Sequence, residues 1–424
     1  MNRRLFLSRF LYSAAFSGLL SLTNIANLSA KSPGRVVVIG GGWGGLSAAK
    51  TIKLLSPEVE VVIIEKEKVF RSCPISNWVI GQIKTMEDIT FSYETLQKRY
   101  DIKFIHDIAS YVDIEKKIVK TEGTILNYDK LVLSPGIELD YSSIENWRPD
   151  YSDIFPAAWK AGRETQLLAN KIKNMRNGGV VAVSIPLSPY RCPPGPYERI
   201  SLIASYIKNN KPGSKLIVLD ANQKIVSKGK LFKKAWDNMY KDIIEYRPDS
   251  KVVKINPNEH ILSTDFDDVK CDVANLIPPQ KAPKLLRETG LIKEKEIWAS
   301  VNAYDFSSSI AEDVFIVGDS TSQISVGRVP KSGYVANSMG KVCGLAIVAE
   351  LYGIKKFPPS MINTCFSLVS SEEGISVSAV YHYDEKLKKI AVVEGASGVS
   401  PESSDIVKDN AWDWAKAIWD DMLT

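Results

Sequence analysis

"RVVVIGGGWGGLSAAKTIKLL", residues 35–55, decides the fold of this chain. It joins a short β-branched run, typical of a buried strand, to a glycine turn and then to a helical pattern. Gly40, Gly42 and Gly45 fit the spacing GxGxxG: the first permits a tight turn, the second lets the backbone approach a diphosphate, and the third lets helix pack on strand. We therefore expect a diphosphate at the helix N-terminus, where free N–H groups and the helix dipole favour an anion.

A second strand supports a dinucleotide site but leaves its ligand open. Residues 59–65, "VEVVIIE", end in Glu65, at the distance where a carboxylate takes the ribose hydroxyls of an adenosine. This motif alone does not separate FAD from NAD. Two later segments favour FAD by resemblance: "YDKLVLSPG" (128–136) and "EDVFIVGDS" (312–320) are similar to segments of the FAD domain in flavoproteins of the glutathione-reductase type. There the aspartate, here Asp319 after Gly318, accepts a hydrogen bond from the ribityl chain.

These segments imply a domain plan for the whole chain. We expect an α/β fold with two Rossmann-like dinucleotide-binding domains and a small C-terminal α+β domain. The FAD domain is split along the chain into residues 31–158 and 276–355, and the second Rossmann-like domain occupies residues 159–275. Residues 356–424 form the C-terminal domain, expected to contribute to the active site and to an interface.

The second domain repeats the strand–turn–helix plan with an altered turn. Its strand at residues 179–185 is followed by "PLSPYRCPPGP" (186–196), which holds five prolines and one cysteine, Cys192. Proline has no N–H to donate and holds its φ angle rigid, so this turn cannot cradle a diphosphate as a glycine-rich turn does. We therefore expect that the NAD site is lost and that Cys192 faces the flavin.

With these features the chain resembles the flavoprotein subunit of flavocytochrome c sulfide dehydrogenase. The resemblance runs over nearly the whole chain after its N-terminal segment, and several of its motifs are not general flavoprotein motifs. They are "RSCPISNWVIG" (71–81), "YRCPPGPYER" (190–199), "ANLIPPQKA" (274–282) and "INTCFSLVSSEEGISVSAVY" (362–381).

The resemblance implies a role for several residues. Cys192 and Cys365 match the family's redox-active disulfide over the flavin, and Cys73 matches the cysteine that holds FAD covalently through its 8α-methyl group. Glu198 matches the candidate acid–base carboxylate. Cys271 and Cys343 match no role, and the apolar surroundings of Cys343 predict a helix core.

The N-terminus predicts export. Arg3 and Arg4 precede an apolar stretch at residues 10–22 and small residues up to Ala30, which indicates a signal peptide over residues 1–30. The paired arginines resemble a twin-arginine signal, which carries folded proteins to the periplasm; an ordinary secretory signal is the alternative.

Composition narrows the remaining possibilities. A net charge of +5 on 424 residues is spread along the chain, so we expect no nucleic-acid partner. The five cysteines form neither CxxC nor CxxCH, so we expect no metal site, and any haem must belong to a c-type cytochrome partner.

Three functions fit these observations. The first is a periplasmic sulfide dehydrogenase that oxidises sulfide and passes electrons to a separate cytochrome c. The second is a sulfide:quinone oxidoreductase at a membrane surface, for which Trp412, Ala415 and Trp419 of the tail could line one helix face. Docking of that face on the protein's own body or on a partner protein is the favoured alternative, because three aspartates of the tail would be repelled by anionic lipid. The third is a binding or assembly protein with an inert flavin.

Overall fold

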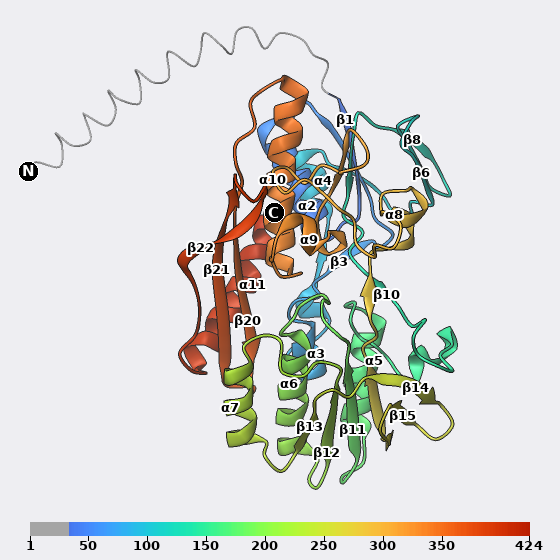
Figure 1. Cartoon of the computed structure of the whole chain (residues 1–424), viewed down its shortest axis with the longest axis vertical. Coiled ribbons are helices and arrows are strands. Elements are labelled where there is room, and N and C mark those ends of the chain that lie inside the picture. Colours follow the sequence, from blue (N-terminus) through green and yellow to red (C-terminus); the bar gives the residue numbers. More distant parts are fainter. Residues whose placement is uncertain (1–33) are drawn as a thin grey trace, which may run out of the picture.

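The computed structural model describes residues 34–424, so the predicted signal peptide lies outside the described residues. Two parallel sheets form the centres of two lobes, and a long antiparallel sheet lies along one side of both (Figure 1). This arrangement confirms the predicted α/β fold with two Rossmann-like domains.

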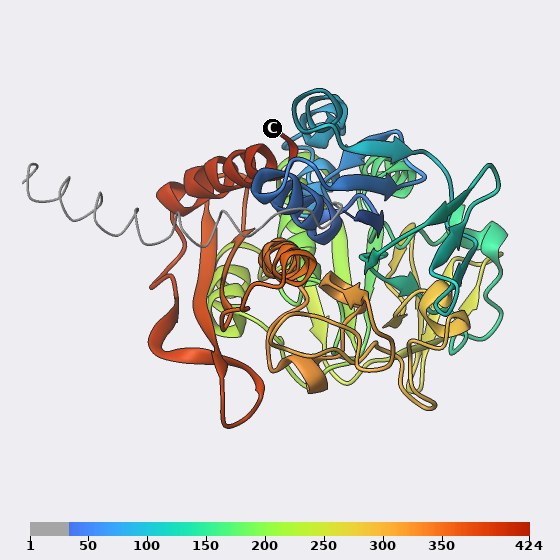
Figure 2. The same cartoon turned by 90° about the horizontal axis from the view of Figure 1, so that it is seen from above.

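The first sheet contains the strands on which the glycine turn depends. Its order is β19-β9-β1-β2-β5, and all neighbours are parallel. The strands are β1 (Arg35–Ile39), β2 (Glu60–Ile64), β5 (Lys103–Ile105), β9 (Lys130–Leu133) and β19 (Val314–Ile316). Because β19 comes from a segment far along the chain, this sheet is built from two separate stretches of sequence. Helices α2 (Trp43–Leu55) and α10 (Gly333–Tyr352) pack against each other beside this sheet (Figure 2).

The second sheet has four parallel strands in the order β13-β12-β11-β17. They are β11 (Val180–Ile185), β12 (Lys215–Asp220), β13 (Ile244–Arg247) and β17 (Val273–Leu276), with α5 (Arg163–Asn174), α6 (Gly195–Asn210) and α7 (Gly229–Met239) around them. The core of this lobe also takes Ile144 and Phe155, which the sequence boundaries assign to the first domain.

The C-terminal part is an antiparallel sheet of β20 (Ser360–Leu368), β21 (Gly374–Asp384) and β22 (Lys389–Val399), followed by α11 (Asp405–Leu423). The tryptophans of α11 face the body of the protein. Trp412 stacks on Trp78 with ring centroids 5.8 Å apart, and Trp419 lies 4.8 Å from Phe91. Trp414 in turn stacks on Trp43 at 6.2 Å. Of the two docking surfaces that the favoured prediction left open, the tail thus packs on the protein's own body.

The remaining strands of residues 34–424 pair in four smaller antiparallel sheets. The strands are β3 (Val69–Arg71), β4 (Thr90–Ser92), β6 (Tyr111–Asp113), β7 (Ile118–Lys120), β8 (Ile125–Asn127), β10 (Glu138–Leu139), β14 (Val252–Asn256), β15 (Ile261–Thr264), β16 (Asp268–Lys270) and β18 (Gln280–Lys281). The sheets are β3-β4, β6-β7-β8, β10-β18 and β14-β15-β16. The remaining helices are α3 (Ser76–Ile80), α4 (Glu94–Tyr100), α8 (Lys284–Glu288), α9 (Gln323–Val326), and the 3-10 turns η1 (Glu87–Ile89), η2 (Pro149–Asp153) and η3 (Gly318–Ser320).

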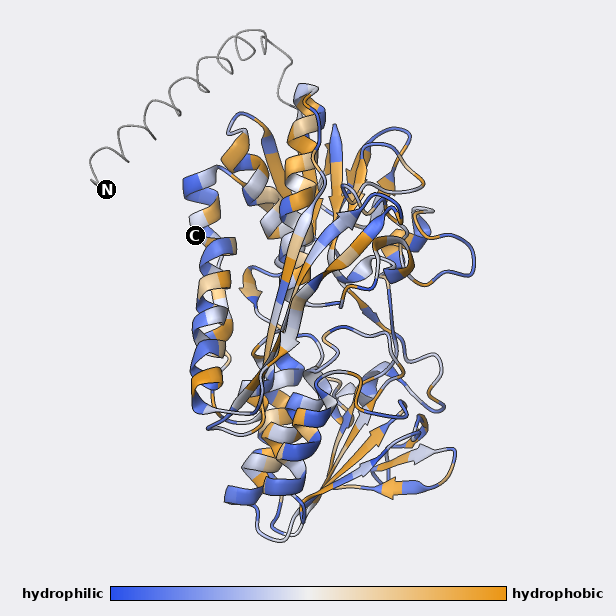
Figure 3. Cartoon of the chain, turned by 60° about the vertical axis from the view of Figure 1, so that its left-hand side comes forward, coloured by the Kyte–Doolittle hydropathy of each residue, from blue (hydrophilic) through white to orange (hydrophobic). Residues whose placement is uncertain are grey.

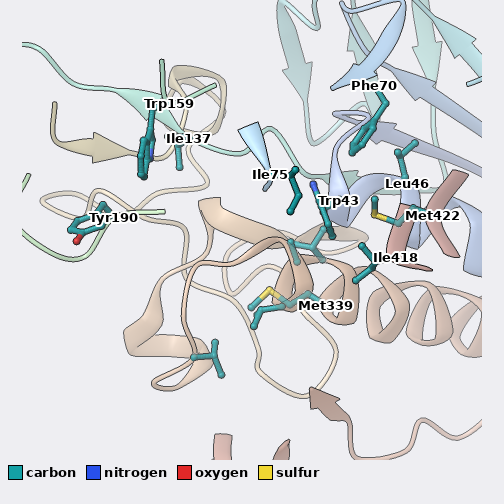
Figure 4. Packing of buried hydrophobic residues seen from close by; sticks show 14 of the residues in the cluster. Trp43, Leu46, Phe70, Ile75, Ile137, Trp159, Tyr190, Met339, Ile418 and Met422 are labelled. Carbon is teal, nitrogen blue, oxygen red and sulfur yellow. The ribbon is translucent and has the colours of Figure 1, made fainter. Parts of the chain in front are cut away.

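Hydrophobic burial holds the lobes together. The parallel strands of the second lobe are largely hydrophobic in Figure 3, as strands covered on both faces must be. Figure 4 shows Trp43 close to Ile418 of α11, so the bulky residue of the glycine turn packs toward the C-terminal helix. Within residues 34–424, no helix combines the length and apolarity that a membrane span requires.

Candidate functional site

At each of the three positions of the turn, glycine is favoured for a different structural reason. Gly40 has φ of +104°, and a Cβ there would lie 2.3 Å from the Ser134 carbonyl oxygen. A Cβ at Gly45 would lie only 2.0 Å from the Gly40 carbonyl oxygen, so α2 packs directly on the turn. At Gly42, by contrast, a Cβ would meet nothing within 4 Å. Gly42 therefore faces open space at the start of α2, as expected of the backbone that approaches a diphosphate.

A cavity of about 340 Å³ opens in front of this turn. Its walls bring together residues from distant parts of the chain: Gly40–Gly44, Glu65, Cys73, Trp159, Cys192, Arg199 and Asp319. Glu65 accepts hydrogen bonds from Gly41 N at 2.7 Å and Glu67 N at 2.9 Å. The cavity thus gathers all of the predicted cofactor-binding segments and one of the two predicted catalytic cysteines.

Asp319 supplies a test of whether this cavity fits a flavin. Its Oδ1 atom is buried and has no hydrogen-bond partner among residues 34–424, and its Oδ2 atom lies 4.0 Å from Arg191 Nε. Burial raises the pKa of Asp319. A buried carboxylate oxygen without a donor is costly, so a ligand hydroxyl at this position would satisfy it. The ribityl chain of FAD carries such hydroxyls, and helix α2 begins at the same cavity without a capping side chain. The residues present therefore fit FAD.

Lys331 links the Gly-Asp motif to the proline loop. Its buried ammonium donates to the carbonyl oxygens of Asp319 and Thr321, both at 2.6 Å, and lies 3.7 Å from the centroid of Trp298. Burial lowers the pKa of Lys331 to about 7. The Lys331 carbonyl oxygen accepts a hydrogen bond from Cys192 N at 2.7 Å. Lys331 thus holds Cys192 in register with Asp319.

Cys73 lies in the loop between β3 and α3, half-buried on the cavity wall. Its Sγ accepts a hydrogen bond from Ala161 N at 3.4 Å, and its carbonyl oxygen accepts from Ser76 Oγ at 2.6 Å. The following residue but one, Ile75, has φ of 76°, an unusual conformation for a β-branched side chain. The structure thus presents this thiol to the cavity, and its thioether to the flavin stays a prediction.

The proline loop places Cys192 at the start of α6. Cys192 has φ of 57°, and any side chain at Gly195 would come within 2.9 Å of its Sγ atom. Burial and the charge of Cys365 both raise the pKa of the Cys192 thiol, and burial raises that of Cys365. The structure holds the two cysteines as separate thiols, so the disulfide between them stays a prediction.

Glu198 lies in the first turn of α6 rather than in the loop itself, and its carboxylate is buried. Oε1 accepts hydrogen bonds from Leu368 N at 2.9 Å and Trp78 Nε1 at 3.2 Å, while Oε2 accepts from Asn77 Nδ2 at 2.9 Å. Burial nevertheless raises the pKa of Glu198. The carboxylate thus bridges α3, α6 and the strand that carries Cys365.

Arg199 is a site residue that motif reasoning missed. Its side chain is 1% exposed, lies 4.8 Å from the centroid of Trp159, and donates to neutral oxygens only. The acceptors are Asn77 Oδ1 at 3.0 Å, Ala157 O and Asn275 Oδ1 at 2.9 Å, and Ala158 O at 2.6 Å. Burial lowers the pKa of Arg199 to about 9. Because its side-chain acceptors Asn77 and Asn275 are neutral and lie far away in the sequence, no local pattern predicts these hydrogen bonds.

The ribose position of the second domain is occupied by the protein's own side chains. Asp220 ends β12, where a carboxylate would bind an adenosine ribose. It is fully buried and accepts hydrogen bonds from the hydroxyls of Tyr197 and Tyr246, both at 2.9 Å, and from Asn222 Nδ2 at 2.7 Å. The carboxylate oxygens of Asp220 thus already accept hydrogen bonds from the protein itself.

The cysteines without a predicted role are buried. Cys343 lies fully buried in α10, which confirms the expected helix core, and Cys271 lies in the core of the second lobe. Across residues 34–424, no three histidine, cysteine or acidic side chains gather as a metal site requires.

Comparison with known proteins places the chain among flavoproteins of sulfur metabolism. The curated relatives include the mitochondrial sulfide:quinone oxidoreductase of Dictyostelium discoideum, which is 21% identical over 84% of this chain and 81% of that protein. They also include the coenzyme A disulfide reductase of Staphylococcus aureus, 24% identical over 85% and 81%. The solved structure of the Aquifex aeolicus sulfide:quinone oxidoreductase has the same fold, with a TM-score of 0.72 and 18% identity over 92% of this chain and 91% of that one.

Three family models match consecutive parts of the chain. The pyridine nucleotide-disulphide oxidoreductase model matches residues 34–151. The central model of the flavocytochrome c sulfide dehydrogenase flavoprotein matches residues 165–278, and the flavin-binding model of the same enzyme matches residues 357–423. The last two models cover the segments that carry Cys192 and Cys365. Over residues 165–278 and 357–423 the chain therefore matches two domains of the flavocytochrome c sulfide dehydrogenase flavoprotein.

Proposed function

We propose that this protein is a periplasmic sulfide dehydrogenase that oxidises sulfide at Cys192 and Cys365 and passes electrons through FAD to a c-type cytochrome. The observation that carries the proposal is the shared cavity: the glycine turn, Cys73, Cys192 and Asp319 all line it. Cys365 lies close enough for its charge to influence Cys192.

The chain's own residues would hold FAD along this cavity. The turn at Gly42 would face the diphosphate, Asp319 would accept from the ribityl chain, and Cys73 would form a thioether with the 8α-methyl group. When bound, FAD supplies a two-electron acceptor that can release its electrons one at a time, which suits a haem.

The sulfur step would begin at the cysteine pair. Hydrosulfide is a soft nucleophile, and its lone pair would form a new S–S bond with one sulfur of a Cys192–Cys365 disulfide. The old S–S bond breaks, and its electron pair stays on the other sulfur as a thiolate, while the first sulfur carries a persulfide. Glu198 would accept the proton of the persulfide, and burial raises the pKa of its carboxyl group, which makes the carboxylate a stronger base.

Two features argue against NAD as the electron acceptor. The turn that would cradle its diphosphate contains five prolines, and the residue that would bind its ribose, Asp220, is engaged by Tyr197 and Tyr246. With no CxxCH in these 424 residues, the haem would belong to a separate subunit.

A quinone is the alternative acceptor, because relatives of this chain include sulfide:quinone oxidoreductases. The tryptophan-bearing tail gives this alternative little support, since Trp412, Trp414 and Trp419 pack on other aromatic side chains of the protein. A third candidate is a binding or assembly protein with an inert flavin, but this function would not explain why Cys192 and Cys365 lie near each other.

The acceptor test uses the purified flavoprotein with sulfide as the donor. We expect reduction of cytochrome c and slow or absent reduction of NAD⁺ and of a ubiquinone analogue. Fast quinone reduction without cytochrome activity would move the protein to the quinone class. Reducible flavin with no turnover on any acceptor would favour the inert-flavin candidate.

The periplasmic location rests on Arg3 and Arg4 of the N-terminal segment. A protein that receives FAD before export needs a route for folded cargo, which the twin-arginine pathway provides. Replacing both arginines by lysine should leave the precursor in the cytoplasm. Unchanged export would point to the general secretory route instead.

A further inference from the structure

Lys228 places a buried ammonium beside the sulfur site. It precedes α7 with φ of 54°, and its side chain belongs to the buried residues at 8% exposure. Its Nζ atom donates to the Cys365 carbonyl oxygen at 3.2 Å and to Ser367 Oγ at 2.8 Å. Helix α7 lies next to the end of β20 in Figure 1, so this lysine ties the second lobe to the strand that carries Cys365.

Within residues 34–424 no carboxylate lies at ion-pair distance from this ammonium, although Glu198 is close enough for Lys228 to oppose the effect of burial on its pKa. Among residues 34–424, Lys228 takes part in no salt bridge, and its two acceptors are neutral oxygens. A buried cation with neutral partners only is costly, so its retention calls for a negative charge nearby at some stage of the protein's work.

The candidates for that charge are the cysteines and Glu198. The ammonium of Lys228 opposes the effect of burial on the pKa of Cys192, Cys365 and Glu198 alike. Two further cations face the site. Arg191 lies toward Asp319 and also acts on Cys192, and the Arg199 guanidinium, held by neutral acceptors, interacts with Cys192 as well. Of these cations, Lys228 is the one that donates to Cys365 itself.

We propose that Lys228 is the electrostatic partner of the cysteine pair, compensating the negative charge that this pair takes up when sulfide opens the bridge between Cys192 and Cys365. The inference rests on the proposed function. Attack by hydrosulfide converts an uncharged disulfide into a persulfide and a thiolate, so the anion's charge enters the protein with the substrate. Lys228 is already in place for it, and its neutral anchors leave its charge available.

Alkylation of the reduced, flavin-loaded protein tests the inference without sulfide. Iodoacetamide reacts with the thiolate, so the rate of labelling at Cys192 and Cys365, read by mass spectrometry of their peptides, reports the fraction ionised at each pH. Lys228→Met should shift both profiles to higher pH by about one to two pH units, or slow labelling about 10–100-fold at a fixed pH below the pKa, as expected for a unit charge within several ångströms at an effective dielectric constant near 20. Lys228→Arg should keep most of the effect.

The matched control is Lys230→Met, which removes an exposed charge two residues further along, in the first turn of α7. Profiles of Lys228→Met and Lys230→Met that coincide would overturn the inference. If Lys228→Met fails to fold, Ser367→Ala, which removes one anchor of the ammonium, should give a smaller shift in the same direction, and no shift would overturn it. If sulfide bleaches the flavin of the unmodified protein but Lys228→Met leaves the alkylation profiles unshifted, this inference alone is refuted. If Lys228→Met shifts the profiles but sulfide does not bleach the flavin, the proposed function alone is refuted.

Discussion

Alanine at Gly42 and at Gly45 should separate the ligand-binding role of the glycine turn from its structural role. At Gly45 the new Cβ would lie 2.0 Å from a backbone carbonyl oxygen, which cannot rotate away. Overpacking of this kind costs about 1–3 kcal/mol and more where backbone must move. At Gly42 the new Cβ meets nothing within 4 Å, and φ of −93° suits any residue. Gly42→Ala should therefore leave the flavin-free protein as stable as before, or more stable by about 0.4–1 kcal/mol.

The affinity for FAD should fall in Gly42→Ala, the variant whose stability does not fall. If the backbone at Gly42 approaches the diphosphate, the added methyl group separates them and disrupts one or two charge-assisted hydrogen bonds. The loss of each such bond is worth about 1.5–3 kcal/mol, or about 10–150-fold in affinity.

The assay uses a Cys73→Ser background, in which FAD can be removed and titrated back. Thermal unfolding of the flavin-free protein gives stability, and fluorescence titration gives the dissociation constant. Gly42→Ala protein that is stable and binds FAD as tightly as the background would refute the assignment of Gly42 to the diphosphate. Gly45→Ala protein of unchanged stability would refute the packing argument.

Three further predictions concern the sulfur site. Flavin should stay with the polypeptide after acid precipitation and be released from the Cys73→Ser variant; a yellow supernatant from the unmodified protein would exclude the thioether. Cys192→Ser and Cys365→Ser should each retain flavin but lose bleaching by sulfide, and normal turnover by either variant would exclude the pair. Because burial raises the pKa of Glu198, a rate that needs its ionised form should rise with pH through that raised value. This limb should vanish in Glu198→Gln, and an unchanged pH profile would remove Glu198 from proton transfer.

The elements that local sequence specifies were predictable. The glycine turn follows from residues 35–55 because its strand, turn and helix are contiguous, and β1 and α2 lie where the pattern indicates. The second βαβ unit was equally visible, and its proline turn is unusual enough to draw attention to Cys192. These features depend on neighbours in the chain, which is the information that periodicity and turn residues carry.

Residues that act through distant partners were not predictable in this way. Lys228 stands just before "KLFKK" (230–234), a run that indicates a solvated helix face, and Lys230, Lys233 and Lys234 are indeed exposed. Nothing in the local pattern distinguishes Lys228 from them. Its burial depends on β20, more than a hundred residues later in the chain. Arg199 is hidden for the same reason, since its acceptors lie before α5 and on β17.

Under the proposed function, the lost nucleotide site and the sulfur site would involve the same first turn of α6. In a dinucleotide-binding domain the first turn of such a helix offers its N–H groups to a diphosphate. Here that turn packs Gly195 against Cys192, sends Glu198 to Leu368 N on β20, and sends Arg199 to the carbonyl oxygens of the linker that leads into the second lobe. Helix α6 thereby contacts both the loop that carries Cys192 and the strand β20 that carries Cys365. A glycine-rich turn that restored diphosphate binding would remove the support on which this alignment depends, so the two functions exclude each other at this position.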